Sequence, residues 1–277
     1  MLAHSLVTAK SAHPDRIMLF LHGILGSRAN WRGIARRFVE ARTDWAAALV
    51  DLREHGDSLG LEGPHSLEAA VEDLESLERT LPLPTGGALG HSFGGKLTLE
   101  WLRSRQRPTE AWVIDASPSP GAADPDSSAT AVVLSTLAEL PRAWPSREAF
   151  VEALVKAGQP QAIAQWLAKN LRRTEDGGRR FGPDLGVIRE LIEDYARTDS
   201  WDVIESLRED CTLDLIIGGR STAVSGADRE RLARVSRSIS SVSAHLIEDA
   251  GHWVHVDAPD ALLSLITADR AAVSGRI

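Results

Sequence analysis

Short continuous runs of apolar residues alternate along the chain with longer segments in which apolar residues recur at helical spacing. Apolar residues three or four positions apart predict amphipathic helices, for example over 67–77 and 97–102. Fully apolar strands separated by such helices are typical of a mostly parallel sheet with helices on both faces. The pattern therefore predicts the α/β class. The apolar runs cover 17–21, 46–50, 88–89, 112–114, 213–217 and 242–247; the first five end before Gly, His or Asp, and the last lies shortly before Gly251 and His252.

The stretch 118–210 has a different pattern. It opens with turn-rich sequence (SPSPGAADPDSS) and continues with helical segments, and it contains no strand pattern. The sequence RRTEDGGRRFGPD within it predicts a loop or a short hairpin. An insertion between two strands of an open α/β sheet lies over the edge where such sheets bind ligands. We therefore expect a core formed by 1–117 and 211–277, and a helical cap, or lid, over 118–210. The helices expected in the cap cover 130–140, 146–157, 161–171 and 185–195, and a last helix in the core covers 260–267.

Composition and charge narrow the function classes. The chain has 277 residues, with 31 Lys and Arg against 39 Asp and Glu, so its formal charge is −8. This balance argues against nucleic acid as a partner, because sequence-independent binding depends on basic residues that neutralise phosphates. A single cysteine, Cys211, cannot form an internal disulfide. No apolar stretch reaches the roughly 18 residues of a membrane helix, and the N-terminus lacks a signal-peptide pattern. We expect a cytoplasmic protein that does not bind membranes; the oligomeric state stays open.

The strongest chemical signal is GHSFGG over 90–95, which lies directly after a predicted strand and directly before a predicted helix. It fits the G-x-S-x-G pattern of a nucleophile elbow. A strand that turns at once into a helix forces Ser92 into a strained backbone conformation. Side chains at positions 90 and 94 would collide with neighbouring backbone, which explains the glycines. We predict that Ser92 is a nucleophile that projects above the sheet, near the positive end of the following helix.

A nucleophilic serine needs a base to remove its proton. His252, in GHWVHVDAP over 251–259, follows the last predicted strand and therefore lies at the same sheet edge as the elbow. His255, three residues later, offers a pair of metal ligands with His252. No third ligand at suitable spacing accompanies the pair, so we predict no metal and favour His252 as the base.

Acyl transfer also passes through an oxyanion that requires preorganised N–H donors. The sequence HGILGS over 22–27 follows a predicted strand and forms a glycine-flanked loop. We expect the backbone N–H groups of Ile24 and Phe93 to form an oxyanion hole, and His22 to support the loop.

Taken together, HGILGS, DLREHGDS (51–58), GHSFGG and GHWVHVDAP resemble the α/β-hydrolase fold enzymes over nearly the whole chain, with an inserted helical cap. The pair DLREHGDS and GHWVHVDAP is similar to the small serine esterases and thioesterases of the alpha/beta hydrolase domain-containing 11 kind and their bacterial relatives. The resemblance implies hydrolysis of carboxylic esters or thioesters by a serine, a histidine and an acid, without a cofactor. We expect structural roles for Asp51, which ends a strand, and for Asp57, whose side chain bonds turn backbone.

The position of the acid departs from the commonest pattern of this fold. The acid usually follows the strand before the last one, in a G-x-x-D arrangement, and that position holds Ser221 here. Asp115 ends the strand after the elbow helix, and the esterases that the chain resembles carry their acid there, within D-x-x-P. The other candidates are Asp228, which reads as a helix-start residue, and Asp249, which is too close in sequence to the histidine. We favour Asp115, although an Asp at a strand end can also be purely structural.

The predicted function is ester or thioester hydrolysis through an acyl-enzyme on Ser92, with an apolar acyl group in the substrate. Trp144 and Trp166 are candidates to line an acyl pocket, although either can serve only to pack the cap. One alternative is a catalytically silent binding protein. Another is a carbon–carbon bond hydrolase or lyase similar to menaquinone-pathway relatives, which a basic pocket would favour. The arginines available for such a pocket are Arg53, Arg142, Arg147 and Arg172. A haloalkane dehalogenase is excluded, because its nucleophile is Asp.

Overall fold

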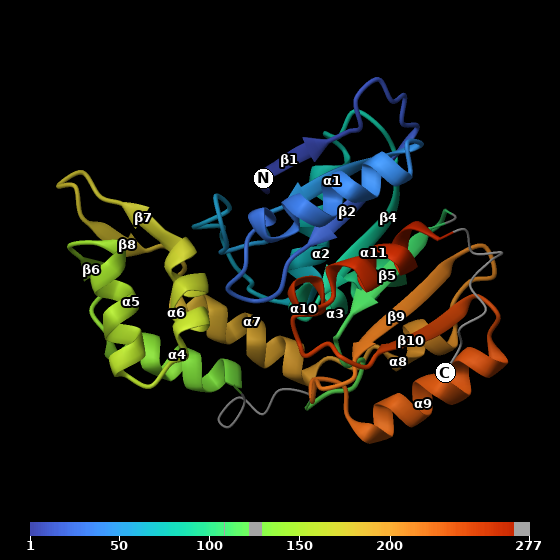
Figure 1. Ribbon diagram of the computed structural model, residues 1–277. Coiled ribbons are helices and arrows are strands. Elements are labelled where there is room, and N and C mark those ends of the chain that lie inside the picture. Colours follow the sequence, from blue (N-terminus) through green and yellow to red (C-terminus); the bar gives the residue numbers. More distant parts are fainter. Residues whose placement is uncertain (108, 122–128, 269–277) are drawn as a thin grey trace.

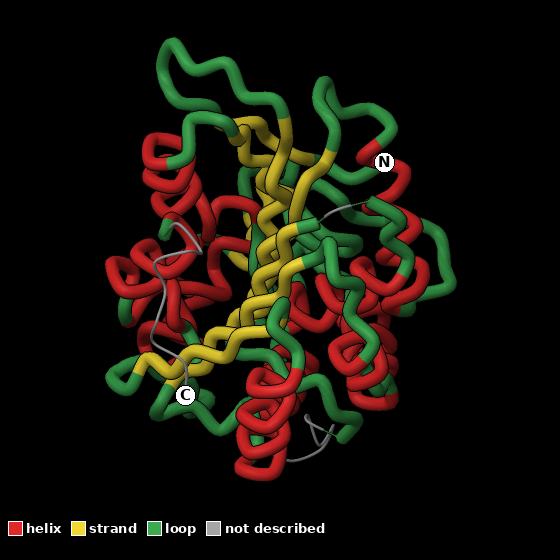
Figure 2. Tube along the Cα trace, turned by 90° about the vertical axis from the view of Figure 1, so that its right-hand side faces the viewer, coloured by secondary structure: helices red, strands yellow, loops and turns green. Residues whose placement is uncertain are grey.

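The computed structural model describes residues 1–107, 109–121 and 129–268. A seven-stranded sheet lies at its centre, and helices cover both faces of this sheet (Figures 1 and 2). The strands are β1 (His4–Val7), β2 (Arg16–Leu21), β3 (Trp45–Val50), β4 (Thr85–His91), β5 (Glu110–Ile114), β9 (Thr212–Gly218) and β10 (Val242–Ile247). Their order is β1-β3-β2-β4-β5-β9-β10, and every pair is parallel except β1 with β3. The predicted α/β class with a mostly parallel sheet is confirmed.

Each face of the sheet has its own apolar core. Along β2, Met18 and Phe20 belong to one core, whereas Ile17 and Leu19 belong to the other. Because both faces are buried, the strands are continuously apolar rather than alternating. The first core is closed by α1 (Arg32–Ala41), α10 (Val254–Asp257) and α11 (Pro259–Thr267), and the second by α2 (Leu67–Glu78), α3 (Phe93–Arg103) and α9 (Gly226–Ser238). A short 3-10 helix, η1 (Arg28–Trp31), precedes α1. No helix in the described part of the chain is long and apolar enough to cross a bilayer.

The segment between β5 and β9 contains the expected helices and additional strands. Its elements are α4 (Ala129–Glu139), β6 (Ala143–Trp144), α5 (Arg147–Lys156), α6 (Gln161–Leu167), η2 (Ala168–Asn170), β7 (Leu171–Arg173), β8 (Arg179–Phe181), α7 (Leu185–Arg197) and α8 (Trp201–Glu205). The short hairpin is confirmed as β7 and β8. The expectation of no strand is wrong, since β6, β8 and β7 form a small antiparallel sheet. Strands of two or three residues are too short to produce an alternating pattern. Part of the turn-rich stretch, 122–128, lies outside the described residues.

A buried lysine of the elbow helix ties the two ends of this inserted segment together. The Nζ atom of Lys96 in α3 donates hydrogen bonds to the backbone carbonyls of Ser119, Tyr195 and Thr198, at 2.9, 3.0 and 2.9 Å. Ser119 lies where the chain leaves the sheet, and the other two lie where it returns. Burial lowers the pKa of Lys96 to about 8. Hydrogen bonds from an ammonium group are stronger than those between neutral groups. Lys96 therefore fixes both ends of the inserted segment, where the chain leaves the sheet and where it returns, against α3.

Candidate active site

Ser92 occupies a strained turn between β4 and α3. Its backbone angles are φ 53° and ψ −115°, in the left-handed range that residues with a side chain rarely adopt. A Cβ atom added to Gly90 would lie 1.9 Å from the carbonyl oxygen of Gly94, and one added to Gly94 would lie 2.6 Å from that of Leu21. Neither position therefore accepts a side chain. The collision expected from the sequence is confirmed at both glycines.

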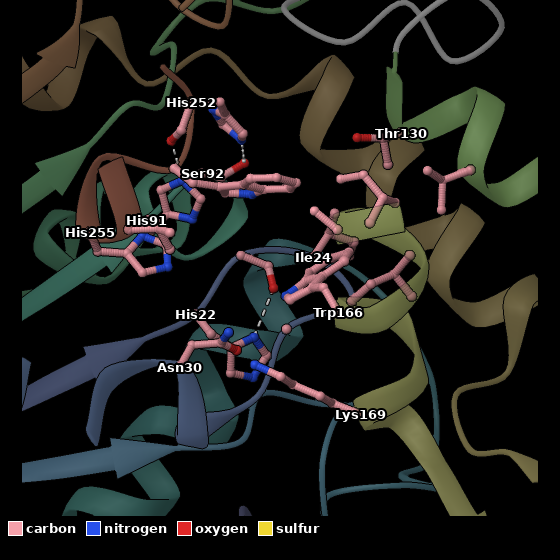
Figure 3. Close-up of a pocket in the computed structure, with 18 of the residues that line it drawn as sticks. His22, Ile24, Asn30, His91, Ser92, Thr130, Trp166, Lys169, His252 and His255 are labelled. Carbon is pink, nitrogen blue, oxygen red and sulfur yellow. Dashed lines mark hydrogen bonds between the residues drawn. The ribbon is translucent and has the colours of Figure 1, made fainter. Parts of the chain in front are cut away.

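The structure brings Ser92, His252 and Asp115 together at the carboxyl edge of the sheet. The Oγ atom of Ser92 lies 3.1 Å from Nε2 of His252, and Nδ1 of His252 lies 2.7 Å from Oδ2 of Asp115 (Figure 3 shows the first of these contacts). A carboxylate only accepts hydrogen bonds, so we assign the imidazole proton to Nδ1. The serine hydroxyl then donates to Nε2. This arrangement places a base within reach of a nucleophile and an acid behind the base.

The carboxylate of Asp115 is fully buried and has two further partners. Its Oδ1 accepts a hydrogen bond of 2.9 Å from the backbone N–H of Gly218, and its Oδ2 accepts one from the hydroxyl of Ser221. Ser221 occupies the position where this fold commonly carries the acid. Its hydroxyl instead holds the acid of the neighbouring strand, so the tips of β5 and β9 are joined behind the histidine.

The two alternative acids do not contact the histidine. Asp228, in the first turn of α9, accepts hydrogen bonds from the hydroxyls of Ser117 at 2.7 Å and Ser119 at 2.5 Å. It therefore belongs to the network around the inserted segment. Asp249 lies exposed on the loop after β10. Of the three candidates, only Asp115 is hydrogen-bonded to His252.

Two buried histidines hold the loop 22–27 beside the elbow. His22 accepts a hydrogen bond of 3.1 Å from the N–H of Leu52, and His55 accepts one of 2.8 Å from the N–H of Leu25, each at Nε2. The Nδ1 atom of each ring lies 2.8 Å from a backbone carbonyl, to which it donates. Each ring therefore has to be neutral to keep its acceptor. Burial lowers the pKa of His22 to about 4 and that of His55 to about 3, which is consistent with these contacts.

The two N–H groups expected to bind an oxyanion lie at this junction. A Cβ atom added to Gly23 would be 3.3 Å from Cβ of Ser92, so the loop approaches the elbow closely. Ile24 follows on the wall of the cavity in front of the serine (Figure 3). Phe93 is the first residue of α3, and its N–H has no acceptor within the helix.

A cavity of about 330 Å³ opens above Ser92 and His252. Helices α4, α6 and η2 of the inserted segment form one side of it, and loops of the core together with η1 and α10 form the other. Trp166 lines this cavity as expected, whereas Trp144 does not. The ring of Trp144 packs against Phe150 within the inserted segment, with ring centroids 5.4 Å apart, so the expectation for this residue is wrong. The apolar residues larger than alanine on the walls are Ile24, Leu25, Trp31, Val133, Ile163, Trp166, Trp253 and Val256.

Sequence reasoning missed several residues of this cavity. Trp253 follows the histidine in a motif already identified, and its ring contacts that of Trp166 at 5.9 Å, which joins the inserted segment to the core. Asn30, Thr130 and Lys169 add polar groups. These residues lie on η1, α4 and η2. Which side of each helix faces the cavity depends on how the helix packs against the core, and no local sequence pattern indicates this.

The four arginines considered for a basic pocket do not line the described cavity. Arg53 is buried, and its Nε lies 2.7 Å from a carboxylate oxygen of Asp73. Arg172 forms an ion pair of 2.7 Å with Asp57. The basic pocket that would favour the carbon–carbon bond cleavage alternative is therefore not formed by these arginines.

The carboxylate of Asp57 pairs with Arg28 and Arg172 rather than with turn backbone, so the expectation for its side chain is wrong. The carboxylate of Asp51 instead accepts from the backbone N–H groups of Arg28 and Asp57.

His255 packs between aromatic rings. Its ring centroid lies 4.8 Å from that of Trp31 and 4.8 Å from that of His91. Among the residues that the structure describes, no group of three or more His, Cys, Asp or Glu side chains is arranged to hold a metal ion. Burial lowers the pKa of His255 to about 4 and that of His91 well below its usual range.

The buried histidines predict a protein that loses stability in mild acid. The folded-state pKa values of His22, His55 and His255 lie near 4, 3 and 4, below the value of about 6.5 in the unfolded chain. Between those values the unfolded chain binds protons that the native state excludes. Each histidine then lowers the free energy of unfolding by about 1.4 kcal/mol per pH unit as the pH falls. Urea midpoints should therefore be stable above pH 7 and fall steeply from pH 6 to pH 5.

A matched pair of variants isolates this effect. His55→Gln removes one buried titrating ring, so its urea midpoint should depend less steeply on pH than that of the wild type. His13→Gln changes an exposed ring and should leave the slope unchanged. Equal midpoints at pH 7.5 and pH 5 in the wild type would contradict the assignment of neutral, buried histidines.

Comparison with known proteins places the chain in a family. The profile of the alpha/beta hydrolase family matches residues 18–265. The sn-1-specific diacylglycerol lipase ABHD11 of Mus musculus is 30% identical over 262 residues, which cover 91% of this chain and 80% of the lipase. Esterase YbfF of Escherichia coli (strain K12) is 28% identical over 265 residues, 94% of each chain. A solved structure of a marine microorganism esterase matches with a TM-score of 0.80 at 20% identity, covering 95% of this chain and 97% of that one. The chain therefore belongs to the alpha/beta hydrolase family.

Proposed function

We propose that this chain is a serine hydrolase that cleaves carboxylic esters through an acyl-enzyme on Ser92. The observation that carries the proposal is the unbroken line of hydrogen bonds from Ser92 through His252 to buried Asp115, at the floor of a cavity. The relatives support the same reaction class, since their names describe esterases and a lipase. We further propose that residues 118–210 act as a cap and that the substrate places an apolar acyl group among the cavity's tryptophans.

In the first half of the proposed reaction, Oγ of Ser92 attacks the ester carbonyl carbon while its proton moves to Nε2 of His252. Asp115 stabilises the imidazolium that forms and keeps Nδ1 protonated. The negative charge on the former carbonyl oxygen is bound by the N–H groups of Ile24 and Phe93. The imidazolium then returns its proton to the departing alcohol, and the acyl group remains on the serine.

In the second half, a water molecule takes the place of the alcohol. His252 removes a proton from the water, whose oxygen attacks the acyl carbon, and the same N–H groups again bind the oxyanion. Collapse of this intermediate breaks the bond to Oγ of Ser92, which recovers its proton from the imidazolium. The products are a carboxylic acid and an alcohol, and the enzyme returns to its starting state. A thioester follows the same steps with a thiol as leaving group.

Carbon–carbon bond cleavage is the second candidate, and the cavity favours it less. A multiply charged substrate would require several cations near the serine, whereas the four candidate arginines lie outside the described lining. Apolar walls and one lysine suit an ester with an apolar body better.

The proposal is tested by measuring hydrolysis of p-nitrophenyl butanoate and hexanoate, with and without a chelator. We expect turnover of both esters at an unchanged rate after chelation, since every proposed step uses side chains and water alone. Matched butanoyl and hexanoyl thioesters then show whether thiol leaving groups are accepted. Loss of turnover on chelation, or no turnover of any ester, would refute the proposal.

The two tryptophans give a matched test of the acyl pocket. Trp166→Ala enlarges the cavity, so we expect it to shift the preference in kcat/KM toward longer acyl chains by about tenfold, the value of one or two methylene contacts. Trp144→Ala removes an equally large ring away from the cavity and should leave the preference unchanged. The measurement is kcat/KM for p-nitrophenyl esters of two to ten carbons, with thermal midpoints to confirm folding. An identical chain-length profile in all three proteins would exclude Trp166 from the acyl pocket.

A further inference from the structure

The described lining of the cavity contains one formally charged side chain, and that charge is positive. Lys169, in η2, lines the cavity, and no Asp or Glu accompanies it there. Its ammonium group forms no ion pair within the described part of the chain. The protein as a whole has a formal charge of −8, whereas the charged residue at the proposed substrate cavity is a lysine without an ion-pair partner among the described residues.

The lysine lies at the end of the cavity remote from the proposed nucleophile. Figure 3 shows Ser92 near one end and Lys169 near the other, with Ile24 and Trp166 between them. A substrate whose carbonyl lies at Ser92 would therefore pass along an apolar stretch before it reaches the ammonium group. Such a cavity is complementary to a molecule with an ester at one end and a negative charge at the other.

A second donor, on Asn30, lies on the wall of the same cavity. The side-chain oxygen of Asn30 accepts a hydrogen bond of 2.7 Å from the N–H of Ser27. This contact uses the acceptor of the amide, so the polar group that remains for a ligand is its NH₂ donor. Figure 3 draws Asn30 and Lys169 on the side of the cavity away from Ser92, and both residues line it. Two donors and no carboxylate at one end favour an anion.

The positive charge of Lys169 also affects His255, another residue that lines the cavity. Burial is the main cause that lowers the pKa of His255 to about 4; the charges of His252 and Lys169 lower it further, whereas Asp257 opposes them. The Nδ1 atom of His255 is buried and has no hydrogen-bond partner in the described residues. A neutral imidazole leaves the lysine as the positive group that an anion meets.

We propose that the cavity binds an ester that carries a carboxylate or phosphate at the far end of its apolar stretch, and that Lys169 binds this anion with Asn30. The inference rests on the proposed ester hydrolysis and adds a substrate class to it. Lys169 is exposed at the edge of the cavity, and an ammonium–anion contact at an exposed position contributes about threefold to binding. The anion can belong to the acyl part or to the alcohol part of the ester, because both extend from the same carbonyl.

The test compares esters that differ only in charge. Mono-p-nitrophenyl glutarate and p-nitrophenyl pentanoate have acyl chains of equal length, one anionic and one neutral. Propyl butanoate and its 3-phosphate derivative provide the same comparison on the alcohol side, followed by acid release. We measure kcat/KM for wild type, Lys169→Met and Lys169→Glu. Lys156→Met is the matched control, since Lys156 is an exposed lysine of α5 that does not line the cavity.

We expect Lys169→Met to lower kcat/KM about threefold for the anionic member of at least one pair and to leave the neutral member unchanged. The loss should appear mainly in KM, shrink at high salt and deepen in Lys169→Glu. The responding pair shows which part of the ester carries the anion. Equal losses for neutral and anionic esters, or no loss in either pair, would overturn the anion site. Neither of these results touches the proposed function, which fails only if neutral esters are not hydrolysed at all.

Discussion

Ser92→Ala should lower ester turnover by about 10⁵- to 10⁶-fold, the cost of removing a catalytic serine in a serine hydrolase. Without Oγ no acyl-enzyme forms, and only attack by water within the oxyanion site remains. The alanine occupies the same strained turn, so the thermal midpoint should stay within a few degrees. Turnover of p-nitrophenyl butanoate and a melting curve measure the two effects separately.

Ser240→Ala is the control for this experiment, since Ser240 is exposed and lies outside the site. Its turnover should equal that of the wild type. Retention of more than a few per cent of turnover in Ser92→Ala would show that another group attacks the ester, and the proposed mechanism would then be wrong.

Asp115→Asn should lower turnover by about 10⁴-fold while the protein stays folded. The amide has nearly the shape of the carboxylate, and its oxygen, in the position of Oδ1, can still accept from the N–H of Gly218. Its NH₂ group takes the position of Oδ2, which faces Ser221 and His252. The amide carries no charge to stabilise the imidazolium of His252. Its NH₂ group also favours the tautomer with the proton on Nε2, which cannot accept the proton of Ser92. The measurement is kcat at saturating ester, together with the thermal midpoint.

Two further variants distinguish the acid from its neighbours. Asp249→Asn changes an exposed carboxylate on the histidine loop and should leave turnover near the wild-type level. Installing a carboxylate by Ser221→Asp in the Asp115→Asn background should restore part of the rate, because the hydroxyl of Ser221 already contacts the position of the carboxylate. Wild-type turnover in Asp115→Asn alone would remove Asp115 from the mechanism.

The parts of this structure that could be predicted from sequence are those with a strong local signal. The strands buried on both faces are continuous apolar runs, so six of them were identifiable. Strand β1 was not, because His4–Val7 is a short, partly exposed edge strand with polar residues. The elbow was identifiable because the turn at Ser92 excludes side chains at positions 90 and 94.

The site could be predicted only in part, for physical reasons. The backbone positions of Ser92, His252 and Asp115 follow from strand order, since the carboxyl ends of parallel strands share one edge. The choice of Asp115 also depended on family resemblance and on Ser221 at the usual position. The walls of the cavity depend on how α4 and α6 pack against the core. No local pattern distinguishes Trp166 of α6 or Lys169 of η2 from the residues around them.

The most direct measurement of the central claim is covalent labelling of the folded protein with a fluorophosphonate, followed by peptide mapping. Such a reagent reacts with a serine that has a functional base and oxyanion site. We predict one label per chain, on the peptide that contains Ser92, with none in Ser92→Ala and much slower labelling in Asp115→Asn. A folded wild-type protein that takes up no label, or takes it up at a residue other than Ser92, would contradict the account.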